Sequence, residues 1–165
     1  MPEYKGLNLV VLPQDKEYQG HFEAARRHKL AMQKCAECSM LRYPPGCACP
    51  WCTSLDYTWQ EVSGKGTIYS YEIVTQAILP GFRDWVPYPI VLVELDEQRG
   101  TPTEHEALRV VANLIRDDGR PEDEANVAIG KRVEATFIDL DETMSVPQFK
   151  LSSEPPQGKT WKYPH

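Results

Sequence analysis

Apolar and polar residues follow a strand-like pattern through most of the second half of the chain. The run YPIVLVEL (88–95) is almost continuously apolar, as in a buried strand, whereas ALRVVANLI (107–115) and RVEATFIDL (132–140) alternate more clearly. The run LDYTWQEVSGKGTIYSYEIV (55–74) moves from a connector into a strand, and VPQFKL (146–151) is the last and shortest strand. Segments rich in proline, glycine or charge separate these runs. The pattern predicts a small antiparallel barrel of five strands.

A barrel of five strands fits the count of the oligonucleotide/oligosaccharide-binding (OB) fold. Before its first strand, Gly64 and Gly66 suit a bend or a bulge. The polar, proline-rich tail SSEPPQGKTWKYPH (152–165) is predicted to be flexible or docked on the surface.

The N-terminal part follows a different pattern. Residues 1–13 contain the apolar run LNLVVLP without a strand signal beside it, which predicts an extended arm that covers a core edge or packs on a partner. Residues 19–34 predict a helix that gives way to a short strand running into Cys35, and Phe22 lies on its apolar side. A basic cluster follows in the same segment: Arg26, Arg27, His28 and Lys29. It is either a solvated face or a groove for phosphates.

All five cysteines lie within residues 35–52, CAECSMLRYPPGCACPWC. Two CxxC pairs place thiolates on two tight turns, a pattern typical of a tetrahedral metal site. The predicted ligands are Cys35, Cys38, Cys49 and Cys52, which leaves Cys47 in the hairpin; Cys47 in place of Cys49 is the alternative. Four thiolates leave no position for water, so the sequence predicts structural zinc, with iron in a rubredoxin-like redox site as the other chemical choice.

Composition limits the classes of function. The 165 residues are 41% hydrophobic and 25% charged, as in a folded protein, and no apolar run approaches the length of a membrane span. A cytoplasmic protein is therefore expected, in which clustered cysteines bind metal rather than form disulfides. The net charge of −6 gives no basic field for nucleic acid.

The sequence also predicts no self-contained active site. Asp141 and Glu142 are adjacent rather than facing, and no serine or cysteine nucleophile sits in a recognisable elbow. The histidines are scattered along the chain: His21, His28, His105 and His165.

The cysteine run, followed by VSGKGTIYSYEIV, YPIVLVELDE, VANLI and IGKRVEATFID, resembles the rubredoxin-like zinc-ribbon proteins with an OB fold, domain of unknown function family thirty-five. The resemblance covers residues 20–151, and the family's ligand pattern falls on the same four cysteines. Its usual glycine after each knuckle is replaced by Ser39 and Thr53, which puts the turn geometry in doubt. The resemblance implies an accessory subunit that assembles with thiolase-superfamily enzymes (thiolases, acyltransferases or steroid side-chain aldolases) and whose OB domain helps to shape an acyl-CoA channel.

The expected fold is therefore mainly β: an arm and helix (1–34), a four-cysteine zinc ribbon (35–60), an OB barrel (61–151) and a tail (152–165). The expected function is that of a zinc-binding, non-catalytic accessory subunit whose partners are a thiolase-like catalytic subunit and acyl-CoA.

Candidate contacts for the acyl chain or the partner lie in the long loop between the first two barrel strands: Phe82, Trp85, Tyr88 and Pro89. A mini-core under that loop is the alternative. Candidate contacts for CoA phosphates are Arg26, Arg27 and Lys29.

Two other classes of function stay open. Single-stranded nucleic-acid binding would use Tyr69, Tyr71 and Trp59 as stacking surfaces, but it needs a basic groove beside them, and Glu72 and the acidic balance count against it. An iron redox carrier would use the four thiolates and leave the OB domain without a purpose.

Overall fold

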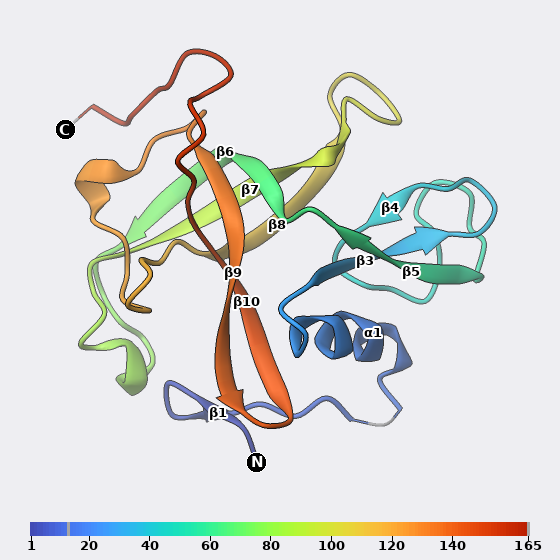
Figure 1. Cartoon of the computed structure of the whole chain (residues 1–165), viewed down its shortest axis with the longest axis horizontal. Helices are drawn as coiled ribbons and strands as arrows, with labels where there is room; N and C mark the ends of the chain where they lie inside the picture. Colours follow the sequence, from blue (N-terminus) through green and yellow to red (C-terminus); the bar gives the residue numbers. More distant parts are fainter. Residues whose placement is uncertain (13, 165) are drawn as a thin grey trace.

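Strands dominate the computed structural model, which describes residues 1–12 and 14–164 (Figure 1). The elements are β1 (Glu3–Tyr4), β2 (Leu7–Asn8), α1 (Lys16–Ala25), β3 (Leu30–Cys35), β4 (Leu41–Arg42), β5 (Tyr57–Val62), β6 (Lys65–Val74), η1 (Pro80–Phe82), β7 (Tyr88–Arg99), β8 (Ala107–Asn113), η2 (Glu124–Asn126), β9 (Arg132–Asp141) and β10 (Met144–Leu151). The mainly β class is thus confirmed. In the part of the chain that is described, no helix has the length and apolar character needed to cross a bilayer.

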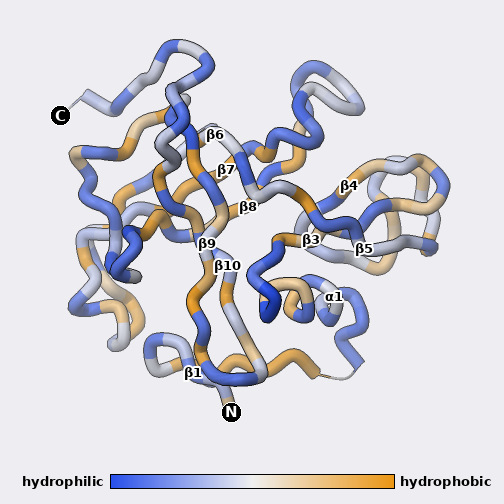
Figure 2. The backbone as a smooth tube through the Cα atoms, in the orientation of Figure 1, coloured by the Kyte–Doolittle hydropathy of each residue, from blue (hydrophilic) through white to orange (hydrophobic). Residues whose placement is uncertain are grey.

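The five predicted barrel strands form one antiparallel sheet in the order β10-β9-β6-β7-β8. The two outer strands meet where Leu114 bridges Phe149 in parallel and the Ile115 amide donates to the Phe149 carbonyl at 2.8 Å. This contact nearly closes the sheet into a barrel, with the strand order expected of an OB fold. Alternation of apolar and polar positions along these strands is visible in Figure 2. Because of this alternation, the apolar side chains of each strand point to the interior of the barrel, where Ile68, Val93 and Phe149 are buried.

A second sheet, with the order β4-β3-β5, carries the cysteine loops. β5 pairs with β3 from Leu30↔Val62 to Cys35↔Tyr57, although the sequence indicated only a connector at these residues. The two sheets share one core, because Leu30 and Met32 pack with the barrel residues. They are also joined by Gln98 at the end of β7, whose side-chain amide bonds both the N–H and the carbonyl of Leu41 at 2.8 Å.

The N-terminal segment departs from the sequence-based expectation in one respect. Instead of an unpaired arm, residues 1–8 form a small hairpin in which Tyr4 pairs with Leu7. α1 begins at Lys16 and ends at Ala25, and His28 takes a left-handed φ of +54° in the turn to β3. A two-residue strand paired only with its neighbour has no alternation to detect, which is why the pattern did not reveal this hairpin.

The tail is docked on the barrel. Trp161 pairs with Ile129 through two backbone hydrogen bonds of 2.8 and 3.0 Å, and the amide of Tyr163 donates to the Tyr71 hydroxyl at 3.0 Å. Of the two alternatives for the tail, the described residues favour the docked one. His165 lies outside the described residues.

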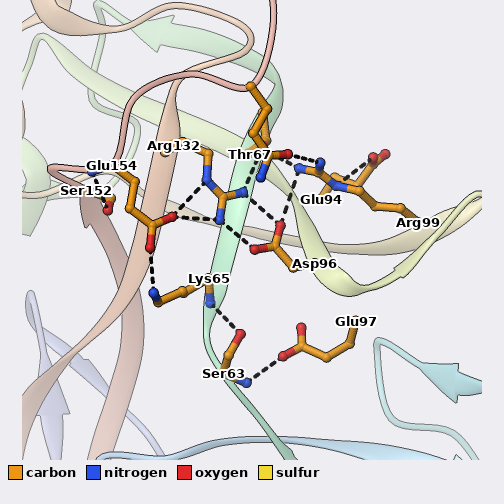
Figure 3. A network of polar contacts seen from close by, with 11 residues as sticks. Ser63, Lys65, Thr67, Glu94, Asp96, Glu97, Arg99, Arg132, Ser152 and Glu154 are labelled. Carbon is orange, nitrogen blue, oxygen red and sulfur yellow. Dashed lines mark hydrogen bonds and ion pairs between the residues drawn. The ribbon is translucent and has the colours of Figure 1, made fainter.

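A buried arginine connects the tail to three barrel strands (Figure 3). The side chain of Arg132 on β9 is only 2% exposed; it donates to both carboxylate oxygens of Asp96, to Glu154 at 3.1 Å and to the Thr67 hydroxyl at 2.9 Å. Glu154 in turn pairs with Lys65. Nothing in the local sequence pattern marks these residues, because the partners of Arg132 come from three segments that are distant in the sequence: β6, β7 and the tail.

The pKa of Asp96 is held below its usual value, first by the hydrogen bonds from Arg132. Because the folded-state pKa is the lower one, its stabilisation is present at neutral pH and is lost as pH falls below about 4 through the folded pKa. Asp96→Asn is therefore expected to lower the free energy of unfolding by about 1–3 kcal/mol at pH 7, and less at pH 3.

Urea unfolding of the wild type and of Asp96→Asn from pH 3 to pH 7 measures this difference. Asp117→Asn is the control, because the Asp117 side chain is 85% exposed and its ion pair with Lys150 lies at the surface. A gap between wild type and Asp96→Asn that stays constant over this pH range would contradict the assignment.

Candidate metal centre and partner-facing surfaces

Four of the five cysteines converge at one end of the β4-β3-β5 sheet. The sulfur atoms of Cys35, Cys38, Cys49 and Cys52 all lie within 4.8 Å of one another. Two pairs join one cysteine from each loop, Cys35 with Cys52 and Cys38 with Cys49, and the sulfur atoms of each pair are 3.5 Å apart. Thiolates around a tetrahedral zinc ion with bonds of about 2.3 Å are separated by about 3.8 Å. The spacing and the chemistry of the four sulfur donors therefore fit such an ion.

Two equivalent turns hold the sulfur atoms. In the first, the Ser39 amide donates to the Cys35 carbonyl at 3.1 Å, and in the second the Thr53 amide donates to the Cys49 carbonyl at 2.9 Å. Ser39 and Thr53 take left-handed φ angles of +62° and +64°. The turn geometry is thus kept without the glycines expected from the family pattern, at a cost on the order of 1 kcal/mol for each residue.

Backbone N–H groups of the turns favour the anionic form of two thiols. The amide of Cys38 points at the Cys35 sulfur and, as the largest effect, lowers the pKa of Cys35 to about 6. Burial opposes ionisation of Cys49, but the amides of Cys52 and Trp51 outweigh it and lower the pKa of Cys49. Thiolates next to amide donors are the form that binds a metal ion.

The pKa values of the other two thiols, Cys38 and Cys52, are raised instead. The Met40 amide favours ionisation of Cys38, yet burial and the neighbouring sulfurs together raise the pKa of Cys38 to about 12. Four thiolates this close repel one another, and a dication at their centre removes that repulsion. Cys47 is exposed and lies outside the cluster, so the geometry favours Cys49 over Cys47 as the fourth donor.

The aromatic candidates of the long loop form a cluster. Phe82, Trp85 and Tyr88 have ring centroids 5.5–6.1 Å apart, and Tyr4 of the N-terminal hairpin packs on Phe82 at 6.0 Å. Pro89 is fully buried. This packing matches the mini-core alternative for Phe82, Tyr88 and Pro89.

Trp85 differs from the other aromatic candidates because it borders two hollows of about 570 and 520 Å³. Asp84 and Arg120 line both hollows, and Lys5 lies 3.7 Å above the Trp85 ring. The larger hollow is also lined by Arg116 and Lys162 and by three acidic residues: Glu122, Asp123 and Glu124. The sequence analysis did not identify these four basic residues, because they come from three separate segments that only the fold brings together: the N-terminal hairpin (Lys5), the loop after β8 (Arg116 and Arg120) and the tail (Lys162).

The basic candidates lie elsewhere. Arg26, Arg27 and Lys29 are exposed around the end of α1, and Arg27 pairs with Glu61 at 2.7 Å. In Figure 1, α1 and the loop that contains η1 lie on opposite sides of the β9–β10 hairpin. The structure therefore does not bring the basic and the aromatic candidates into one site.

The residues considered for stacking nucleic-acid bases do not form a platform. Tyr71 is 7% exposed, and Trp59 packs edge-on against Tyr57 in the ribbon sheet. Tyr69 is exposed, but the Arg109 guanidinium lies 3.8 Å from its ring centroid. Within the described residues, the four-cysteine group alone has the arrangement of a metal site.

Comparison with known proteins adds a family. The family model described as "ChsH2, C-terminal OB-fold domain" matches residues 59–137. A solved structure described as "Ltp2-ChsH2(DUF35) aldolase" is 30% identical with a TM-score of 0.68, and the alignment covers 87% of this chain and 98% of that one.

Two curated relatives are longer than this chain. One is a "Probable enoyl-CoA hydratase alpha subunit" of Thermomonospora curvata. It is 37% identical, and the alignment covers 78% of this chain and 35% of the relative. The other, a "3-oxo-4,17-pregnadiene-20-carboxyl-CoA hydratase alpha subunit" of Mycobacterium tuberculosis, is 34% identical over 72% of this chain and 33% of its own length. The chain thus spans about a third of the length of these relatives. Together with the OB barrel and the four-cysteine ribbon, the nearly complete match to a solved DUF35 chain shows that this chain belongs to the DUF35 family.

Proposed function

We propose that the chain is a non-catalytic accessory subunit of a thiolase-like enzyme that makes or breaks a carbon–carbon bond of an acyl-CoA. The observation that carries this proposal is the match over 98% of the DUF35 chain of a two-component aldolase. The arrangement of the described residues is consistent with it, because their only metal-type cluster has four donors and no free position for substrate. Two relatives named as alpha subunits of acyl-CoA hydratases point to the same substrate class.

Zinc is the metal that we propose for the four cysteines. A closed four-thiolate site supplies no water for chemistry, so the ion would act as a cross-link between two turns that have little core of their own. A reducing compartment such as the cytoplasm would keep the thiols available for the metal. Iron would make the purified protein coloured and redox-active, and zinc would leave it colourless.

We further propose two contact surfaces. Arg120 lines both hollows beside Trp85, but the larger one also has the carboxylates of Asp84, Glu122, Asp123 and Glu124, so charges of both signs suit a polar surface of the catalytic subunit better than the phosphates of an acyl-CoA. Arg26 and Lys29, which have no ion-pair partner among the described residues, would meet acidic groups of the catalytic subunit, whereas Arg27 is already paired. Phe82, Tyr88 and Pro89 would act indirectly, by holding Trp85 in place.

Mild affinity purification of the chain from its native cell, followed by mass spectrometry and by metal analysis, tests the proposal. The expected result is a thiolase-like chain in stoichiometric amount and one zinc ion per chain. Recovery of the chain alone, or with nucleic acid, would contradict the accessory role.

A further inference from the structure

A pocket of about 360 Å³ lies between the N-terminal arm, the exposed side of α1 and the turn joining β9 to β10. Its walls are mainly apolar, with Leu9, Val10 and Val11 from the arm, Phe22 from α1 and Met144 from β10. In Figure 2 the stretch of the arm that follows β2 is a continuous apolar segment beside the end of the β9–β10 hairpin. We call this feature the arm–helix pocket. Its size is that of sites that hold a ligand or a large inserted side chain.

The N-terminal segment that borders the pocket also exposes several apolar side chains to solvent. Val10 is 53% exposed and Leu12 43%. Three more of the large apolar side chains exposed on the described chain lie in the first 18 residues: Met1, Leu7 and Tyr18. Met1 and Val10 line the pocket itself, and exposed apolar side chains gathered at one place are typical of a protein interaction site, whereas isolated ones are ordinary.

The charged residues at the rim indicate what kind of occupant fits. Glu23 on α1 and Arg26, the residue that directly follows α1, both line the pocket. Among the described residues neither has an ion-pair partner, although the adjacent Arg27 and His28 pair with Glu61 and Asp139. An organic anion would meet Arg26 but would be repelled by Glu23. A protein surface can present an apolar side chain to the pocket and charges of both signs to the rim, which is the usual anatomy of an interface.

We propose that the arm–helix pocket is an anchor point for the thiolase-like catalytic subunit, which inserts an apolar side chain between Val10 and Phe22 and pairs with Glu23 and Arg26. This inference rests on the proposed function and deepens it, because it assigns the contact to one face of the chain. That face is separate from the hollows beside Trp85.

The chain offers a matched pair of variants. Val10 and Val111 are 53% and 57% exposed, and Val111 borders a different apolar hollow on the outer face of the barrel, with Ile90 and Leu92. Because both side chains are largely in solvent, aspartate at either position is expected to leave folding unchanged, which circular dichroism and thermal unfolding would check.

Binding of the thiolase-like subunit of the same cell would be titrated calorimetrically with the wild type, Val10→Asp and Val111→Asp. Val10→Asp is expected to raise the Kd at least about 30-fold, as for an interface hot spot, and Val111→Asp less than about 3-fold. Hydrogen exchange of the wild-type complex should show new protection in residues 9–11 and 19–26.

Three results would overturn the inference. If the wild type does not bind the subunit, the proposed function fails and the inference fails with it. If the wild type binds and Val10→Asp binds equally well, or new protection lies only elsewhere, the anchor is wrong while the accessory role stands. If the chain alone self-associates and Val10→Asp abolishes this, a second copy rather than the catalytic subunit fills the pocket.

Discussion

Cys49→Ser is expected to release the metal and to unfold the segment between β3 and β5. Cys49 is buried in the four-sulfur cluster, and its loss leaves three donors on turns that the proposed ion would hold together. Structural zinc contributes on the order of 10 kcal/mol to the folding of such a unit. The barrel should stay folded but become less stable, because Leu30 and Met32 of β3 belong to its core.

Metal content by mass spectrometry and hydrogen exchange of β3 and β5, compared with β7 and β9, measure this effect. Cys47→Ser is the matched control, because Cys47 is exposed and lies outside the cluster. It should keep the metal and the protection of the ribbon. Loss of metal in Cys47→Ser and its retention in Cys49→Ser would mean that Cys47 is the fourth ligand.

Phe149→Ala should have the second largest effect, a loss of about 3–5 kcal/mol in the free energy of unfolding. Phe149 is 1% exposed, and it lies on β10 where that strand meets the end of β8. Truncation leaves a cavity at the point where the barrel closes, and the surrounding strands can relax only partly.

Equilibrium unfolding in urea compares Phe149→Ala with Phe137→Ala. Phe137 is half-buried on β9 and stacks on His28 at a centroid distance of 5.3 Å, so its truncation should cost much less. Equal losses for the two variants would show that closure of the barrel at Phe149 contributes little to stability.

The barrel strands could be predicted because each one carries its own signal. Buried strands read as apolar runs and half-buried strands as alternation, so the strands beginning at Tyr88, Ala107 and Arg132 were each recognised locally. The cysteine spacing likewise identified the four residues that the fold brings together. The division of the chain into an arm with a helix, a ribbon, a barrel and a tail stays a prediction.

Features that depend on long-range pairing could not be predicted. The sequence of β5 (Tyr57–Val62) reads as a connector, because its partner β3 lies before the cysteine loops and nothing nearby indicates that pairing. The contacts of Arg132 with Asp96 and Glu154 join residues that are 36 and 22 positions away. The grouping of Trp85 with Arg120 likewise exists only after folding. Local patterns report which face of an element is buried, but not which distant residue lies against it.

Reconstitution of acyl-CoA turnover tests the accessory role most directly. The thiolase-like subunit, this chain and an equimolar mixture would each be assayed with the acyl-CoA that the subunit accepts. We predict no turnover by this chain alone and faster turnover by the mixture than by the subunit alone. Turnover by this chain alone, or a rate of the subunit that does not change when the chain is added, would contradict the account.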